Sequence, residues 1–65
     1  MPVLSVTMGE IPKEQKKELI VGLTKTAVDI TGIPAQFFVV TINELPDINL
    51  GVGGRTVEEI KQDHQ

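Results

Sequence analysis

The chain opens with MPVLSVTM, residues 1–8, and the interpretation of the whole sequence starts from this apolar stretch. Successive residues of a β-strand point to opposite faces, so a half-buried strand shows an alternating pattern. Here the side chains divide into two sets, with Val3, Ser5 and Thr7 on one face and Leu4, Val6 and Met8 on the other. We therefore predict a strand over residues 2–8.

Pro2 has unusual chemistry for so simple a residue. If Met1 is removed, the Pro2 nitrogen becomes a free secondary amine at the start of an apolar strand. Burial disfavours the charged form of an amine, and an ordinary α-amino group already titrates near ~7.7–8.0. Such an amine can serve as a general base without a side chain. On these two residues alone, the simpler interpretation is that Pro2 only begins an edge strand.

A long helix is predicted over residues 13–31. Pro12 suits a helix start, because the N–H that proline lacks would be unpaired there. Apolar side chains recur along this segment at helical spacing, namely Leu19, Ile20, Leu23, Ala27 and Ile30. Gly32 is placed to end the helix in a left-handed conformation, and Pro34 cannot continue it.

The strongest strand signal is FFVVTI, residues 37–42. This stretch is apolar on both faces, as is typical of a strand covered on both sides. One helix can cover only one face, so we expect another subunit on the other. Strand, long helix and strand form a β-α-β unit, whose strands should be parallel and whose crossover should be right-handed.

The last third of the chain is rich in turn residues and ends in a short amphipathic stretch. Residues 51–54, GVGG, permit tight backbone reversal. They do not match the phosphate-binding loop G-x-x-x-x-G-K-[ST], so we predict a short β-hairpin there. Residues 57–61 are predicted to form a turn or short helix of little intrinsic stability.

Composition limits the possible functions. The chain has 65 residues, no cysteine and one histidine, His64, which we expect to be solvated. We therefore expect one domain, residues 1–65, without a disulfide or zinc site. A domain this small buries a modest fraction of its surface, so oligomerisation is the expected source of stability.

The charge and hydropathy of the chain argue against several partners. Its net charge is −3, whereas nucleic acids and anionic membranes attract clustered positive charge. No apolar run approaches the ~20 residues of a membrane span. The N-terminus also lacks the basic region of a secretory signal. We therefore expect a cytoplasmic protein that binds neither nucleic acid nor membrane.

The order of these features resembles the 4-oxalocrotonate tautomerase family, whose superfamily also contains macrophage migration inhibitory factor. The resemblance extends from Pro2 to about Ile60. It is carried by the Met-Pro start, Glu14-Gln15-Lys16 and Leu19-Ile20 in the helix, Ile42-Asn43-Glu44, and Gly51-Val52-Gly53-Gly54. It implies an α+β fold, a small β-α-β unit with parallel strands and a C-terminal β-hairpin, assembled into hexamers.

The resemblance also implies a chemical role for Pro2. In the family, the proline exposed by methionine removal is the general base of a tautomerase that uses no metal or cofactor. It moves a proton from a 2-hydroxydienoate, such as a 2-hydroxymuconate-like compound, to a distant carbon and so forms the 2-oxo acid. If Met1 is retained, the Pro2 nitrogen is an amide and cannot act as a base.

Three substrate-binding positions depart from the family pattern. An arginine before the helix corresponds to Ile11, and a second arginine, supplied by a neighbouring subunit, corresponds to Val39. An aromatic residue before the glycine turn corresponds to Leu50. Arginine grips a carboxylate bidentately and stays charged, so this pocket should be more apolar than is typical. The nearby cations are Lys13, Lys16, Lys17 and Arg55, each of which could also be an ordinary solvated charge. Arg55 is the leading candidate, because the glycine-rich turn could direct it toward a neighbouring subunit's pocket.

Two functions remain open at this point. The first is a tautomerase, an isomerase that interconverts the enol and keto forms of a 2-oxo acid, with Pro2 as its base and a homohexamer as its assembly. The alternative is a non-catalytic oligomeric scaffold or small-ligand-binding protein on the same fold. The absence of arginine at Ile11 and Val39 favours the alternative, whereas Pro2 favours the enzyme.

Overall fold

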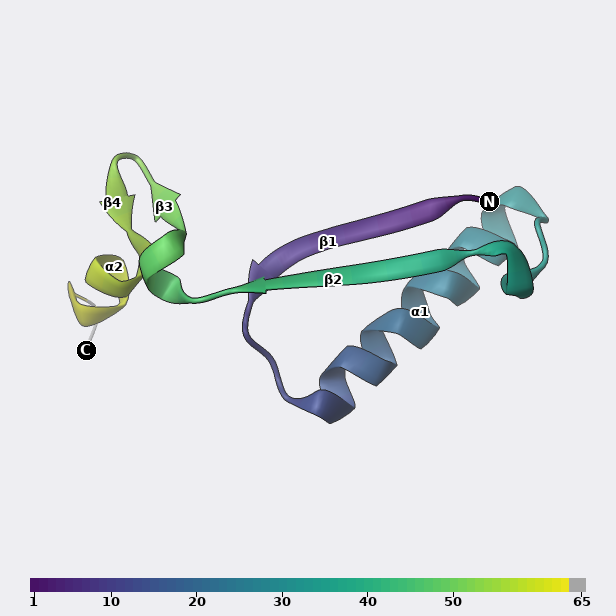
Figure 1. The fold of residues 1–65 in the computed structure, drawn as a ribbon, viewed down its shortest axis with the longest axis horizontal. Coiled ribbons are helices and arrows are strands. Elements are labelled where there is room, and N and C mark those ends of the chain that lie inside the picture. Colours follow the sequence, from purple (N-terminus) through teal and green to yellow (C-terminus); the bar gives the residue numbers. More distant parts are fainter. Residues whose placement is uncertain (64–65) are drawn as a thin grey trace.

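A computed structural model describes residues 1–63 of the chain (Figure 1). Its helices and strands are, in order, β1 (Val3–Gly9), α1 (Lys13–Thr31), β2 (Val39–Leu45), β3 (Gly51–Val52), β4 (Arg55–Thr56) and α2 (Val57–Asp63). Two short 3-10 turns, η1 (Ala35–Phe37) and η2 (Asp47–Asn49), lie on either side of β2. The fold is therefore α+β, with a β-α-β unit followed by a hairpin and a short helix, as predicted.

The two long strands are parallel and pair along their whole length. The register runs from Val3 opposite Val39 to Gly9 opposite Leu45, and α1 lies along one face of the pair (Figure 1). The predicted alternation of β1 is confirmed, because Leu4, Val6 and Met8 are partly buried while Val3, Ser5 and Thr7 are exposed. On the uncovered face, the hydroxyls of Ser5 and Thr41 are hydrogen-bonded at 3.0 Å.

The bounds of α1 agree with the prediction, and its ends follow from the residues there. The carbonyl of Pro12 accepts the first helical hydrogen bond, from Lys16 N–H at 3.1 Å. At the other end Gly32 has φ 75°, and its N–H donates to the Val28 carbonyl at 2.9 Å. A left-handed residue at this place is far less costly for glycine than for other residues.

The second strand begins two residues later than predicted. Phe37 belongs to η1 and Phe38 follows it, so neither residue is part of β2. Pro34 holds the extended conformation before the turn, with φ −60°, and its carbonyl accepts a hydrogen bond from Phe37 N–H at 3.1 Å. This local turn uses the backbone groups that a strand would need, and the ladder starts only at Val39.

The end of the chain forms an arm, which we define as residues 46–63. The predicted hairpin is present, with Val52 opposite Arg55 and with Gly53 and Gly54 at φ 62° and 82°. The helix that follows is longer than the predicted 57–61. The Thr56 hydroxyl caps its start, since it accepts from Glu59 N–H at 3.1 Å and donates to the Glu59 carboxylate at 3.1 Å. A threonine at this position pairs an N–H that the helix itself leaves unpaired, and so stabilises the helix start.

The described residues of one chain enclose no core. None of residues 1–63 is buried, and the apolar side chains of Val21 and Ile30 are 58% and 79% exposed. The radius of gyration is 15.2 Å, whereas a compact chain of this length would have roughly 11 Å. Figure 1 shows the reason, since the arm extends away from the β-α-β unit instead of folding back on it.

Candidate active site

Pro2 is fixed to the sheet through its backbone. The Val39 N–H donates a hydrogen bond to the Pro2 carbonyl oxygen at 3.0 Å, and the next residue, Val3, is paired with Val39 in the register. Pro2 is partly buried, while Met1 before it is 86% exposed. This end of the sheet lies beside the C-terminal end of α1 (Figure 1). Two predicted site residues, Pro2 and Val39, are therefore adjacent.

The side chains that flank Pro2 on the two strands are apolar. Val3 is 58% exposed and Val39 is partly buried. The segment that leads into β2 adds Phe37, which is 49% exposed. The strand residues on either side of this end of the sheet, Val3 and Val39, are therefore apolar.

Ile11 lies at the opposite end of β1, in the loop that enters α1. Its N–H donates to Glu44 Oε2 at 2.9 Å, and Lys16 Nζ is 2.5 Å from Glu44 Oε1. The hydrogen bond from Lys16, and after it the one from Ile11 N–H, hold the pKa of the Glu44 carboxyl below its ordinary 4.5, although burial opposes them. The Glu44 side chain is 23% exposed. Sequence reasoning did not identify Glu44 as a residue that contacts this loop.

Leu50 and Arg55 both lie in the arm. The Leu50 carbonyl accepts from Val57 N–H at 2.8 Å, which closes the base of the hairpin. Arg55 donates to the Asp63 carboxylate, and its Nε lies 3.8 Å from the Glu59 carboxylate. In one chain, therefore, the charge of Arg55 is already paired with acids of α2. Because Arg55 lies in β4 and outside α2, the four-residue spacing rule for helices did not predict this pairing.

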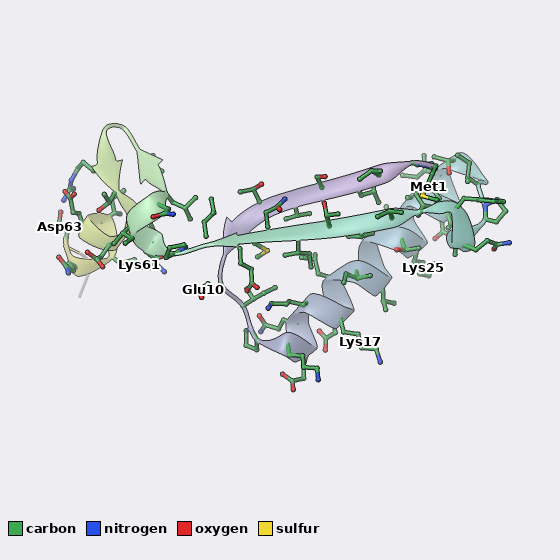
Figure 2. All side chains as sticks on the ribbon, viewed as in Figure 1. Met1, Glu10, Lys17, Lys25, Lys61 and Asp63 are labelled. Atoms are coloured by element: carbon green, nitrogen blue, oxygen red, sulfur yellow. The ribbon has the colours of Figure 1, made fainter. Side chains whose placement is uncertain are left out.

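One chain does not bring the five predicted site residues together. Pro2 and Val39 lie at one end of the sheet, and Ile11 lies at the other. The seven residues of β1 span about 23 Å, at a rise of ~3.3 Å per residue. Leu50 and Arg55 lie farther away, because the arm begins where β2 ends (Figure 1). Met1 and Asp63 accordingly mark opposite ends of the molecule (Figure 2).

The surface of residues 1–63 includes two open hollows that bear on the site. One, of about 490 Å³, separates the end of β1 from the arm, and its lining includes Glu10, Asp47, Glu58 and Lys61. Lys61 Nζ is 2.9 Å from the Asp47 carboxylate, which leaves this hollow polar. The other, of about 450 Å³, is an apolar groove on α1 lined by Ile20, Val21, Thr24, Lys25, Val28, Asp29 and Ala35. We call it the α1 groove.

Metal binding and membrane insertion were also considered for the described part of the chain. Within residues 1–63, no three His, Cys, Asp or Glu side chains are grouped so that they could hold a metal ion. His64 lies outside the described residues. Neither helix in that range has the length and apolar character needed to cross a bilayer.

Comparison with known proteins gives consistent matches over almost the whole chain. The model of the family described as "Tautomerase enzyme" matches residues 2–60. A curated relative, the probable tautomerase K2 of Dickeya dadantii (strain 3937), is 39% identical over 59 residues, which are 91% of this chain and 88% of the relative.

Solved structures show the same fold. TomN, a 4-oxalocrotonate tautomerase homologue in the tomaymycin biosynthetic pathway, superimposes with a TM-score of 0.95 at 29% identity, covering 98% of this chain and 100% of TomN. A heterohexamer 4-oxalocrotonate tautomerase from Chloroflexus aurantiacus J-10-fl gives 0.87 at 33% identity, covering 92% and 98% of the two chains. The family expected from the sequence is thus confirmed, and the chain belongs to the tautomerase enzyme family.

Proposed function

We propose that this protein is a cofactor-independent tautomerase in which Pro2, freed by removal of Met1, is the general base for an enol or 2-oxo acid. The observation that supports this most directly is the hydrogen bond from Val39 N–H to the Pro2 carbonyl at 3.0 Å. It holds the residue through its carbonyl, an atom that removal of Met1 would leave unchanged. A base must be held rigidly within reach of its proton to be effective.

The proposed reaction moves one proton and leaves the substrate's composition unchanged. The lone pair of the Pro2 nitrogen takes the proton of the enol hydroxyl, and the carbon–oxygen bond becomes a carbonyl. The electron pair shifts along the conjugated system to a distant carbon. That carbon then takes the proton from the prolinium ion, which regenerates the base. The apolar side chains of Val3 and Val39 flank Pro2. Surroundings of low polarity disfavour the cationic form of the Pro2 amine and so favour its neutral form.

The complete site would require more than one copy of the chain. Ile11, Leu50 and Arg55 lie at the far end of the molecule from Pro2, so one chain cannot place them around a single substrate. A second copy whose arm or loop reaches the Pro2 end would complete the pocket. Arg55 would then be the cation of that pocket, provided that the substrate carboxylate competes with Asp63 and Glu59.

Self-association is supported by the surfaces that one chain leaves uncovered. None of residues 1–63 is buried, although a stable domain needs buried apolar surface. The α1 groove, with Val21 58% exposed, and the uncovered face of the sheet are two such surfaces. We propose a homohexamer, an assembly size that the Chloroflexus relative also has, although that protein is a heterohexamer.

The absence of arginine at Ile11 and Val39 also favours a second candidate function, a non-catalytic scaffold or small-ligand binder. Proton exchange separates the two functions. The chain that begins at Pro2 is incubated in heavy water with simple enol acids, and ketonisation is followed by NMR and ultraviolet absorbance. A tautomerase speeds the conversion and introduces deuterium at the protonated carbon. A scaffold that binds the acid shifts its resonances but leaves the conversion rate at that of the solution without protein.

A further inference from the structure

Glu44 is the residue whose contacts the proposed catalytic chemistry does not explain. It lies near the end of β2, opposite Met8 in the register, and its side chain is partly buried on the side that α1 covers. From there its carboxylate reaches the loop before α1 and the helix itself. Its two oxygens have separate partners, with Ile11 N–H at 2.9 Å from one and Lys16 Nζ at 2.5 Å from the other.

The Ile11 amide depends on this contact because its partner is a side chain. Ile11 follows β1 and precedes α1, so its N–H belongs to neither a strand ladder nor a helix. The carboxylate of Glu44 accepts that N–H from 33 residues away along the chain. Hydrogen bonds to an ionised acceptor are shorter and stronger than neutral ones. One acidic side chain thus ties the loop to β2, in addition to the strand pairing that ends at Gly9 and Leu45.

We propose that Glu44 is a positioning residue, which holds the loop bearing Ile11 in place for the substrate through the Ile11 N–H and Lys16. This rests on the proposed function, because Ile11 is a proposed substrate contact. The same arrangement affects specificity. Glu44 accepts the Ile11 N–H of the loop and pairs with the ammonium group of Lys16 in α1. The Ile11 N–H is thus already engaged and the Lys16 charge is offset, which weakens their attraction for a second carboxylate of a substrate.

Two substitutions of Glu44 separate the effects of charge and of hydrogen bonding. Glu44→Gln keeps the length of the side chain but has one acceptor oxygen instead of two. Glu44→Ala removes both acceptors. Lys16→Met removes the ion pair and leaves the carboxylate free to accept from Ile11. The matched control is Asp47→Asn, a carboxylate-to-amide change at the ion pair between Lys61 and Asp47 in the arm, whose Nζ–Oδ2 distance is 2.9 Å.

The first readout is the exchange rate of the Ile11 amide hydrogen, measured by NMR on the assembled protein, which is independent of activity. We expect the exchange rate to rise about tenfold or more in Glu44→Ala, because a charged hydrogen bond is lost. The rise should be smaller in Glu44→Gln. Lys16→Met should raise the rate less than Glu44→Ala does, and Asp47→Asn should leave it close to that of the wild type. An unchanged Ile11 rate in Glu44→Ala, with the fold intact by circular dichroism, overturns the proposal.

The second readout is the division of the kinetic effect between KM and kcat with a monocarboxylate enol. Loosening of a substrate-contacting loop should raise KM several-fold in Glu44→Gln and leave kcat within about twofold, because Pro2 is unaltered. A raised exchange rate with an unchanged KM overturns the positioning role. If the wild type converts no enol acid at all, the proposed function is wrong, and the Ile11 exchange rate still decides whether Glu44 holds the loop.

Discussion

The backbone N–H of Val39 donates to the carbonyl oxygen of Pro2 at 3.0 Å, so the proposed base is tied to the first residue of β2. This contact uses an atom that every residue type has at position 2. The chemistry of the Pro2 nitrogen can therefore be changed by substitution without removal of the bond that positions it. The relationship makes the role of Pro2 open to a clean test.

Pro2→Ala, with Met1 removed, is expected to lower kcat/KM by ~10²–10⁴, the usual contribution of a positioned general base. Alanine keeps the carbonyl that accepts from Val39 N–H, but its nitrogen is a primary amine, which is a weaker base than the secondary amine of proline. Steady-state kinetics measure the loss, and an unchanged thermal melting curve shows that the sheet end is intact. Activity equal to that of the wild type would remove Pro2 from the mechanism.

Arg55→Met should raise KM for an enol acid by roughly 10-fold or more if Arg55 is the cation of the pocket, because a charged hydrogen bond is lost. Lys61→Met is the matched control, since Lys61 also forms an ion pair in the arm, with Asp47 at 2.9 Å.

The wild type should handle mono- and dicarboxylate enols with similar kcat/KM. A dicarboxylate preference of ~100-fold, about 2.7 kcal/mol, would reveal a second carboxylate clamp.

Self-association is expected to give a particle of six times the 7.1 kDa mass of the chain. Val21→Glu should shift the assembly toward smaller species, because it places a charge in the α1 groove, where Val21 is 58% exposed in one chain. Light scattering coupled to size exclusion measures both masses at micromolar concentration. A monomeric wild type would contradict the composite site.

Stability should depend on pH through Glu44. Its pKa is lowered in the folded chain, first by the hydrogen bond from Lys16 and then by the N–H of Ile11. A carboxyl with a depressed folded pKa stabilises the fold above its unfolded pKa, close to the ordinary 4.5, and that contribution is lost as the pH falls through the lower folded value. Melting temperatures of the wild type and Glu44→Gln should therefore differ at neutral pH and converge in acid. A constant difference down to about pH 3 would show that this carboxylate is not the source.

Local signals in the sequence predicted most of the fold. The alternation of MPVLSVTM indicated β1, Gly32 marked the end of α1, and the glycines at 53 and 54 indicated the hairpin. The prediction for Phe37 and Phe38 was wrong because hydrogen bonds to Pro34 and Ala35 formed a turn there, overriding their strand preference.

The site was only partly accessible from the sequence, and the reason is physical. The ion pair between Arg55 and Glu59 depends on how β4 leads into α2, and the contact of Arg55 with Asp63 needed α2 to extend beyond residue 61. The bond between Ile11 and Glu44 depends on the register of β2 against β1 across 33 residues. No local pattern encodes that register.

The most direct test of the central claim compares two forms of the chain that differ only in Met1. At 65 residues, both the 1–65 and 2–65 forms can be made by chemical synthesis, confirmed by intact mass and folded side by side. The form that begins at Pro2 has a basic secondary amine, and in the other the same nitrogen is an amide without basicity. We predict that only the 2–65 form accelerates the ketonisation of enol acids. Equal activity of the form that retains Met1 would show that Pro2 merely begins a strand.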